Sequence, residues 1–206
     1  MRDEKIGDYL DQLADRVPAP GGGAAAALHA AVGAALLGMV ARYSTGEQYA
    51  ADQEKISRII TESDELRSIA LRLAEADAEA FGAVTDAYRM PRSTEAESAD
   101  RSAALAKALV GAAWPPTQVI GIAGMVVDLA EALAAIGNRN VASDVAAAAE
   151  AARAAAATAR VNVEINLASI TDAQASLEMI AETGKADGVI SRAEQVTAAV
   201  REQIRA

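Results

Sequence analysis

The amino-acid sequence predicts an all-helical protein, a compact bundle of several helices around a long central helix rich in alanine and glycine, with no sheet. Alanine, the strongest helix former, supplies much of the 52% hydrophobic content, whereas aromatic residues make up only 3%. No segment shows the alternation of β-branched and aromatic residues that is typical of a half-buried strand. Because the 206 residues contain no long linker and no convincing repeat, we expect a single domain over residues 1–206.

The first half of the chain predicts three helices. A first helix is expected over about residues 3–16, with one apolar face formed by Ile6, Tyr9, Leu10, Leu13 and Val17. Pro18 and Pro20 end it, and an alanine-rich helix follows over about residues 22–43. A long third helix is expected over about residues 51–88, closed by Met90-Pro91.

The second half is punctuated by caps, prolines and glycines. Thr94-Glu95-Ala96-Glu97 has the pattern of a capping box, so a helix begins there. We expect Trp114-Pro115-Pro116 to break the chain, with the next helix ending before Gly137. Ser143 or Asp144 then caps a helix that runs to about Ser169. One or two further helices follow, interrupted near residues 184–188.

The composition excludes several classes of function. A net charge of −10 disfavours binding to nucleic acid and to an anionic membrane surface. The absence of cysteine and the single histidine leave no thiolate chemistry and no expected metal site. The charged N-terminus is unlike a signal peptide, so a cytoplasmic protein is expected. The apolar segment Ala24–Ala41 is mostly alanine and glycine and has no counterpart elsewhere, which favours a buried helix over a transmembrane one.

The turn Pro20-Gly21-Gly22-Gly23 is the first candidate site. A glycine-rich turn at a helix N-terminus presents free N–H groups and the positive end of the helix dipole, which suits a carboxylate, a phosphate or a carbonyl oxygen. A tight turn with close helix packing explains the same glycines equally well. No strand precedes the turn and the Lys-Ser/Thr of a P-loop is missing, so neither nucleotide motif is present.

Asp77 is the second candidate, because it lies four residues from both Leu73 and Phe81 on the apolar stripe of its helix. A carboxylate there must be paired, hydrogen-bonded or protonated, and such groups often serve as general acids or bases. Spacing alone favours the simpler interpretation, a buried ion pair with an arginine of another helix.

The third candidate combines the segment that holds Asn140, Ser143 and Asp144 with the amides of Asn162 and Asn166. Ser143 and Asp144 are ordinary N-cap residues. Asn162 and Asn166 lie one turn apart among apolar residues, so their amides need partners from a neighbouring helix or a polar ligand. His29, alone in an alanine field, is interpreted as a structural histidine bonded to a backbone carbonyl or as a subunit contact, in preference to a general base.

Taken together and in order, these segments resemble the cyclodeaminase/cyclohydrolase family, which comprises the C-terminal half of formiminotransferase-cyclodeaminase and stand-alone bacterial relatives. The resemblance spans roughly residues 5–172. It rests on Pro18-Ala-Pro-Gly-Gly-Gly-Ala24, Glu75-Ala-Asp77-Ala-Glu-Ala-Phe81, Ala87-Tyr-Arg-Met-Pro91, Gly137-Asn-Arg-Asn140 with Ser143-Asp144, and Asn162-Val-Glu-Ile-Asn166-Leu-Ala-Ser169.

The resemblance implies an all-helical homodimer that handles one-carbon units on tetrahydrofolate. Relatives convert 5-formiminotetrahydrofolate to 5,10-methenyltetrahydrofolate with loss of ammonia, or hydrolyse the methenyl compound to 10-formyltetrahydrofolate. It implies no metal and no cofactor beyond tetrahydrofolate as substrate. Asp144 and Asp77 would be the catalytic residues; the substrate would be bound by Pro20, Gly21, Gly22, Gly23, Asn140, Ser143, Asn162 and Asn166.

Two departures from the family pattern keep other functions open. Ala24 replaces the serine that relatives usually carry, and Gly46-Glu47-Gln48 stands where they tend to have lysines. A family member that acts on another formimino- or amidine-like small molecule is one alternative. A non-catalytic helical dimer that serves as an interaction module is the other, and a pocket lacking both Asp77 and Asp144 would favour it.

Overall fold

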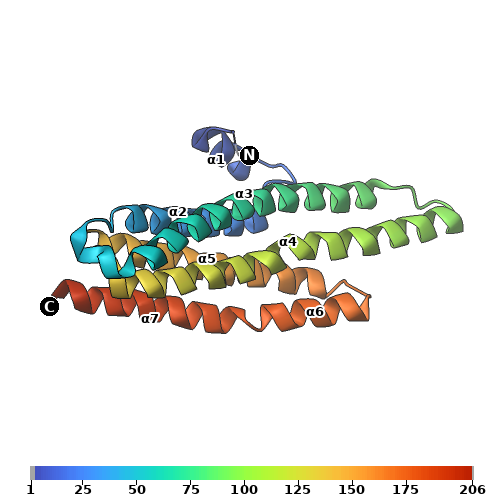
Figure 1. Cartoon of the computed structure of the whole chain (residues 1–206). Coiled ribbons are helices and arrows are strands. Elements are labelled where there is room, and N and C mark those ends of the chain that lie inside the picture. The colour runs from blue at the N-terminus through green and yellow to red at the C-terminus, as the bar shows by residue number, and fades with distance from the viewer. Residues whose placement is uncertain (1–2, 206) are drawn as a thin grey trace.

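The computed structural model describes residues 3–205, and this part of the chain is helical, with no strand (Figure 1). The helices are α1 (Ile6–Ala14), α2 (Gly22–Arg42), α3 (Gln53–Arg89), α4 (Glu95–Ile136), α5 (Ala142–Leu167), α6 (Ala173–Thr183) and α7 (Ala186–Arg205). Two short 3₁₀ turns, η1 (Glu47–Asp52) and η2 (Arg139–Val141), precede α3 and α5. The all-helical prediction is confirmed.

Four helices, α2 to α5, form the core of the bundle, and α7 packs on α5 and α4 (Figure 1). Helix α2 is central: it packs against α3, α4 and α5, and its alanines are almost all buried. Because alanine and glycine have almost no side chain, neighbouring helices approach α2 closely and compensate for the small area that each residue buries. The predicted alanine- and glycine-rich central helix is therefore present. Helices α3 and α4 run on beyond the other helices as a two-helix arm (Figure 1).

Helix α4 contradicts the predicted break at Trp114-Pro115-Pro116. It runs without interruption from Glu95 to Ile136, with both prolines inside it. Each proline removes one backbone donor, but both rings are buried in the bundle, and the Thr117 hydroxyl donates 2.8 Å to the carbonyl of Ala113 in the same turn. Tertiary packing of a 42-residue helix has outweighed the local preference for a break. The capping box at Thr94 and Glu97 is formed as predicted.

The start of α5 differs from the expected cap. The N-cap residue is Val141, so Ser143 and Asp144 lie in the first turn, where Asp144 faces the positive end of the helix dipole without capping it. The side chain that caps the turn before α5 is that of Asn138. Its oxygen accepts from the Asn140 N–H, and its amide N–H donates to the Tyr43 carbonyl. These bonds fasten the α4–α5 turn to the end of α2.

Helix α1 lies apart from the bundle (Figure 1). Of its predicted apolar face, only Tyr9 is buried, whereas Ile6, Leu10 and Val17 are exposed. The first predicted helix is present, and most of its apolar face is not buried within the described part of the chain.

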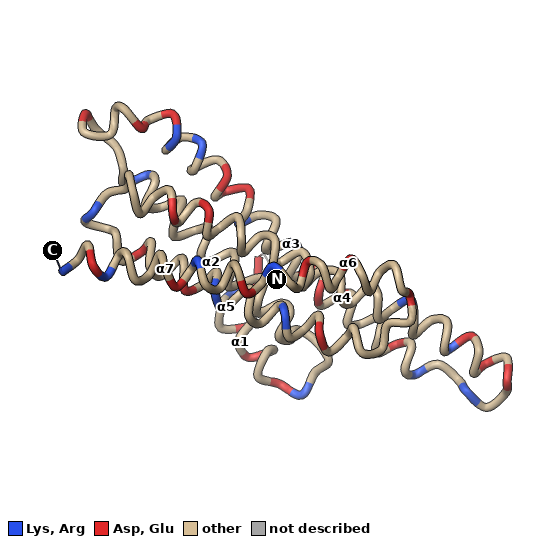
Figure 2. Tube along the Cα trace, turned by 90° about the horizontal axis from the view of Figure 1, so that it is seen from below, with Lys and Arg blue, Asp and Glu red and all other residues tan. Residues whose placement is uncertain are grey.

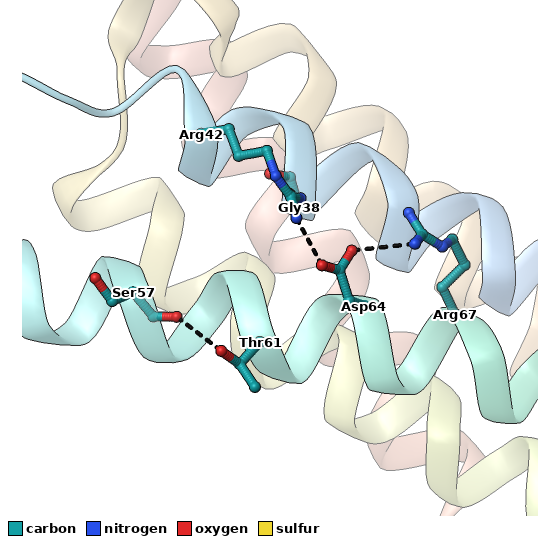
Figure 3. A network of polar contacts seen from close by, with 6 residues as sticks. All are labelled: Gly38, Arg42, Ser57, Thr61, Asp64 and Arg67. Atoms are coloured by element: carbon teal, nitrogen blue, oxygen red, sulfur yellow. Dashed lines mark hydrogen bonds and ion pairs between the residues drawn. The ribbon is translucent and has the colours of Figure 1, made fainter.

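Polar contacts fix the far end of α2 to α3. Arg42 donates to the Gly38 carbonyl and forms an ion pair of 2.6 Å with Asp64, which also contacts Arg67 at 3.2 Å (Figure 3). Because these groups are about half exposed, the network contributes little energy and mainly sets the register of the two helices. Charges of both signs are spread along the outer helices and the tip of the α3–α4 arm (Figure 2).

Two helices, α2 and α4, are long and apolar enough to cross a membrane by length and composition. In their most apolar windows, 61% of the α2 residues and 50% of the α4 residues are buried inside the fold, as in core helices. The expectation that no second segment compares with residues 24–41 is wrong, because α4 continues through its prolines as one long apolar helix.

Candidate active site

The glycine turn leads directly into α2. Gly21 is the N-cap, with extended dihedral angles, and its carbonyl accepts the first intrahelical bond, 3.0 Å from the Ala25 N–H. The N–H groups of Gly22, Gly23 and Ala24 come before this ladder and are available to other acceptors. One of them is used, because the Ala24 N–H donates to the carboxylate of Asp77.

Gly22 and Gly23 are needed because side chains of two other helices lie against them. A Cβ at Gly23 would lie 2.0 Å from Oδ1 of Asp77 in α3, and a Cβ at Gly22 would lie 3.1 Å from Nδ2 of Asn162 in α5. The first distance is impossible for a carbon atom, so only glycine fits at position 23 while Asp77 keeps this orientation. The sequence predicted a close approach at this turn; the groups that approach are the candidate site residues themselves.

Asp77 is half-buried and forms no ion pair within residues 3–205, so the favoured interpretation as a buried pair with an arginine is wrong. Burial raises the pKa of its carboxyl above the ordinary value, and the hydrogen bond from the Ala24 N–H opposes that rise in part. A carboxyl with a raised pKa and one fixed donor is suited to take up and return a proton.

Asn162 and Asn166 satisfy their amide N–H groups within α5. Asn162 donates 2.9 Å to the Thr158 carbonyl, and Asn166 donates 3.0 Å to the Asn162 carbonyl. Their side-chain oxygens accept no hydrogen bond from the described residues. They are therefore free to accept from a ligand with N–H groups.

These residues line one pocket of about 200 Å³. Its walls come from the glycine turn, α3, α4 and α5, and consist of Pro18, Gly21, Gly22, Gly23, Asp77, Phe81, Ala112, Pro116, Asn162, Ile165 and Asn166. The volume is below the usual range for a whole ligand, so this pocket encloses only the reacting end of a larger molecule. Asp77 is the one ionisable group among the residues that line this pocket, and the other walls are apolar side chains and amides. In such surroundings electrostatic interactions with its charge are stronger than in water.

Several pocket residues were missed from the sequence. Phe81 and Ile165 were not among the predicted site residues, although they line the pocket and 45% and 72% of their surfaces are exposed. Pro116 was interpreted as a helix start, and it reaches the pocket because α4 runs through it. The position of Phe81, one turn after Asp77, was the available signal.

The structure separates the other predicted residues from this pocket within one chain. Pro20 is buried and faces a neighbouring hollow beside Glu75 and Glu79. Asn140, Ser143 and Asp144 lie at the opposite end of α5: Asp144 precedes Asn162 by 18 residues, which is five turns or about 27 Å. His29 lies exposed in the middle of α2, with no hydrogen bond to a described residue, so the interpretation as a carbonyl-bonded histidine is wrong. Within the described ranges, no group of three His, Cys, Asp or Glu residues is arranged to hold a metal ion.

Comparison with known proteins agrees with this geometry. The sequence pattern of the formiminotransferase-cyclodeaminase family matches residues 5–185. The chain belongs to this family. It is 34% identical over 203 residues to a methenyltetrahydrofolate cyclohydrolase of Methylorubrum extorquens, covering 98% of the chain and 96% of that relative.

Two further family relatives show how the fold is used elsewhere. The crystal structure of formiminotetrahydrofolate cyclodeaminase from Thermotoga maritima superposes with a TM-score of 0.86 and 31% identity, covering 98% of each chain. The mouse formimidoyltransferase-cyclodeaminase is 32% identical over 173 residues, which are 84% of this chain and 32% of that enzyme. The family's catalytic fold therefore extends over nearly the whole of this chain.

Proposed function

We propose that this family member hydrolyses 5,10-methenyltetrahydrofolate to 10-formyltetrahydrofolate, with Asp77 as the proton-transfer group. The observation that carries the proposal is the pocket itself, in which one carboxyl with a raised pKa stands against three helix N-terminal N–H groups and two amides. Hydrolysis of a cationic one-carbon bridge needs a single base for water, and one carboxylate supplies it. The name of the relative that matches along 96% of its own length supports this choice.

The reaction divides into two steps that one carboxyl can serve. Asp77 in its ionised form takes a proton from water as the oxygen bonds to the bridging carbon, which becomes tetrahedral while the amidinium charge is neutralised. The bond from carbon to N5 then breaks, protonated Asp77 returns its proton to N5, and the carbinol proton leaves to solvent as the formyl group forms. One water is consumed and one proton released, with no change in oxidation level, so we propose that no metal or redox cofactor takes part beyond tetrahydrofolate as substrate.

Cyclodeamination is the second candidate, favoured by the Thermotoga maritima cyclodeaminase, whose solved structure matches along 98% of both chains. In that reaction N10 bonds to the formimino carbon and loses its proton, and the departing nitrogen must gain one to leave as ammonia. Two proton transfers at different nitrogens suit two carboxyls. Among the described residues of one chain, Asp77 is the only carboxyl that lines the pocket, so a second must come from elsewhere.

We propose a homodimer in which the second copy supplies Asp144. Helices α2 and α5 share an uncharged outer surface, called here the α2–α5 face, whose residues recur about every turn along each helix. It consists of Ala25, His29, Val32, Leu36, Met39, Ala147, Ala151, Ala154, Thr158, Val161 and Ile165. Val32 and Val161 are each more than half exposed on it. A chain of net charge −10 that leaves such a face uncharged is suited to bury it against a second copy.

The packing of α2 against α5 shows what a two-fold axis through this face would do. The helices are antiparallel, with Gly22 beside Asn162 and Gly33 beside Ala151, so the middle of α2 faces the middle of α5. A two-fold axis near Val32 places the end of each helix in one copy beside the opposite end of the same helix in the other copy. The partner's Asp144, which lies on the same side of α5 as Asn162 five turns away, then comes to the glycine-turn pocket.

A mixture of two inactive variants tests the shared site. In the cyclodeaminase reaction, for which two carboxyls are proposed, Asp77→Asn and Asp144→Asn homodimers are expected to be inactive, whereas a co-refolded mixture forms heterodimers with one intact site. Recovery of about a quarter of wild-type activity in the mixture supports the shared site by statistical pairing. No recovery in heterodimers isolated through a different affinity tag on each variant contradicts it.

The choice of reaction is tested with purified protein and the absorbance of methenyltetrahydrofolate. One cuvette starts from the methenyl compound and the other from 5-formiminotetrahydrofolate. A fall above the spontaneous rate in the first identifies the cyclohydrolase, and a rise in the second identifies the cyclodeaminase. An unchanged signal in both cuvettes contradicts a folate function and redirects attention to another amidine-like ligand.

A further inference from the structure

Helix α1 buries one aromatic side chain. Tyr9 is its single buried residue, at 8% exposed, while Ile6 on the same face is 80% exposed. A helix of nine residues with so little burial gains almost nothing from packing alone. The position of Tyr9 therefore calls for an explanation beyond a place in the core.

The hydroxyl of Tyr9 is fully buried and has no hydrogen-bond partner among the described residues. A buried polar group without a partner destabilises a protein by about 1–3 kcal/mol, so native structures rarely keep one unless it gains a partner in another state. A phenylalanine would fill the same space without this penalty. The phenol is thus the part of Tyr9 that needs a role.

Asp77 is the ionisable group that acts most strongly on this phenol. The pKa of Tyr9 is raised, first by burial, then by the negative charge of Asp77 and then by that of Glu4. Tyr9 thus lies within electrostatic reach of the carboxyl that faces the glycine turn.

We propose that Tyr9 is a positioning residue: its phenolic O–H, which has no partner within residues 3–205 of this structure, donates to the ionised Asp77 carboxylate in solution and holds it in its orientation toward the pocket. The inference rests on the proposed function of Asp77. In this proposal α1 serves to hold the Tyr9 hydroxyl near the glycine turn. Pro18 and Pro20 join α1 to that turn.

The described surroundings of Asp77 favour a second neutral donor. From α2 it receives the Ala24 N–H, and the neighbouring residues of α4 and α5 in the pocket, Pro116, Asn162 and Asn166, are uncharged. Among the described residues, the ionisable groups that line the neighbouring hollow are acidic, namely Asp3 and Glu4 before α1 and Glu75 and Glu79 on α3. Since Asp77 has no ion-pair partner within residues 3–205, neutral donors are what can hold its carboxylate ionised and oriented, and the phenol would add one to the Ala24 N–H.

Titration of the Asp77 carboxyl by carbon NMR tests the contact directly, in wild type, Tyr9→Phe and the control Tyr88→Phe. Tyr88 is 55% exposed and follows Asp77 by 11 residues on α3, about 16 Å along the helix, so it serves as a control outside the pocket. Loss of a donor to the ionised form is expected to raise the pKa of Asp77 in Tyr9→Phe by about one unit, a tenfold change in proton affinity, and to leave it unchanged in Tyr88→Phe. An unchanged Asp77 titration in a folded Tyr9→Phe protein overturns the proposal.

A reciprocal measurement keeps the test decisive if Tyr9→Phe does not fold. Ultraviolet titration of the tyrosines in Asp77→Asn, where Tyr9 remains, is expected to show one phenol that ionises at lower pH than in wild type; identical curves overturn the contact. In the enzyme assay, Tyr9→Phe is expected to lower kcat about tenfold with KM nearly unchanged and to shift the pH profile to higher pH. Both titrations test the contact between Tyr9 and Asp77 without any enzyme activity. A protein that is inactive on folates would therefore refute the proposed function but not this contact.

Discussion

Asp77 and Gly23 form the contact on which the site depends, since the carboxylate occupies the volume that any side chain at position 23 would fill. The arrangement places a carboxyl beside free helix N–H groups, at the expense of burying part of a charge without a cation. Polar groups held in this way mark functional sites, because a merely stable core would replace them with apolar residues.

Replacing Gly23 with alanine is expected to remove activity while the helix remains intact. The new Cβ would lie 2.0 Å from Oδ1, so Asp77 must swing away from the pocket, and a misplacement of about 1 Å lowers kcat about 100-fold. Gly121→Ala, in the middle of α4 with open space around the added methyl, is the matched control. Steady-state kinetics of both variants check this, and a fully active Gly23→Ala enzyme would show that the orientation of Asp77 is unimportant.

The raised pKa of Asp77 also predicts a stability effect. In the unfolded chain this carboxyl has its ordinary pKa, so ionisation is easier there than in the folded protein. The contribution of the Asp77 carboxyl to the free energy of unfolding is therefore fully present at low pH, and it is lost as the pH rises through the pKa of the carboxyl in the folded protein. Asp77→Asn is expected to be more stable than wild type at pH 7, with the difference vanishing below about pH 4. Urea unfolding at both pH values measures it, and a less stable variant at pH 7 would show that the ionised group is stabilised.

At the level of secondary structure, close approach between α2 and α5 is set by glycine. A Cβ at Gly33 would lie 3.0 Å from the Ala148 carbonyl oxygen and 3.1 Å from the Val126 side chain. A backbone carbonyl cannot rotate away as a flexible side chain can, so α2 and α5 must move apart to accommodate a methyl group at position 33.

Gly33→Ala is accordingly expected to destabilise the protein by about 1–3 kcal/mol through overpacking. Gly121→Ala should stabilise it by up to about 1 kcal/mol, because alanine favours the helix and meets no atom there. Urea denaturation of both variants provides the comparison. Equal midpoints would indicate that α2 and α5 are packed less closely than the geometry shows.

The sequence predicts elements well where local chemistry determines them. The capping box at Thr94 and the end of α4 before Gly137 fall where expected, because caps and glycine stops act within one turn. The continuation of α4 through Pro115 and Pro116 could not be predicted, since it depends on burial against helices distant in sequence. For the same reason Tyr9, an apolar-face residue by periodicity, gave no sign of its proximity to Asp77.

For the whole molecule, the site residues divide into two groups. The glycine turn, Asp77, Asn162 and Asn166 meet in one pocket, although the sequence analysis grouped the two asparagines with Asp144. Asp144, Ser143 and Asn140 lie about five helical turns away in the same chain. A linear sequence cannot distinguish a site within one chain from a site shared by two, because symmetry brings together residues that no contact within the chain connects.

Dimer formation through the α2–α5 face predicts a specific loss. Val32→Glu places a charge at the centre of this face, where its desolvation opposes association, and is expected to give a folded monomer by sedimentation. Ile204→Glu, at a residue 64% exposed near the end of α7, is the control and should remain dimeric. A wild-type protein that sediments as a monomer, or a dimeric Val32→Glu, would exclude this interface.

The most direct test of the central claim, that the Asp77 pocket is where the folate reaction takes place, compares kcat for methenyltetrahydrofolate hydrolysis in Asp77→Asn and Asp86→Asn. Asp86 lies on the same helix, pairs with Arg89 and is exposed at the surface. General acid–base catalysis contributes about 100- to 10,000-fold, so Asp77→Asn is expected to lose at least about 100-fold in kcat while Asp86→Asn keeps wild-type activity. Full activity in a folded Asp77→Asn protein would contradict the claim and place the chemistry elsewhere on the molecule.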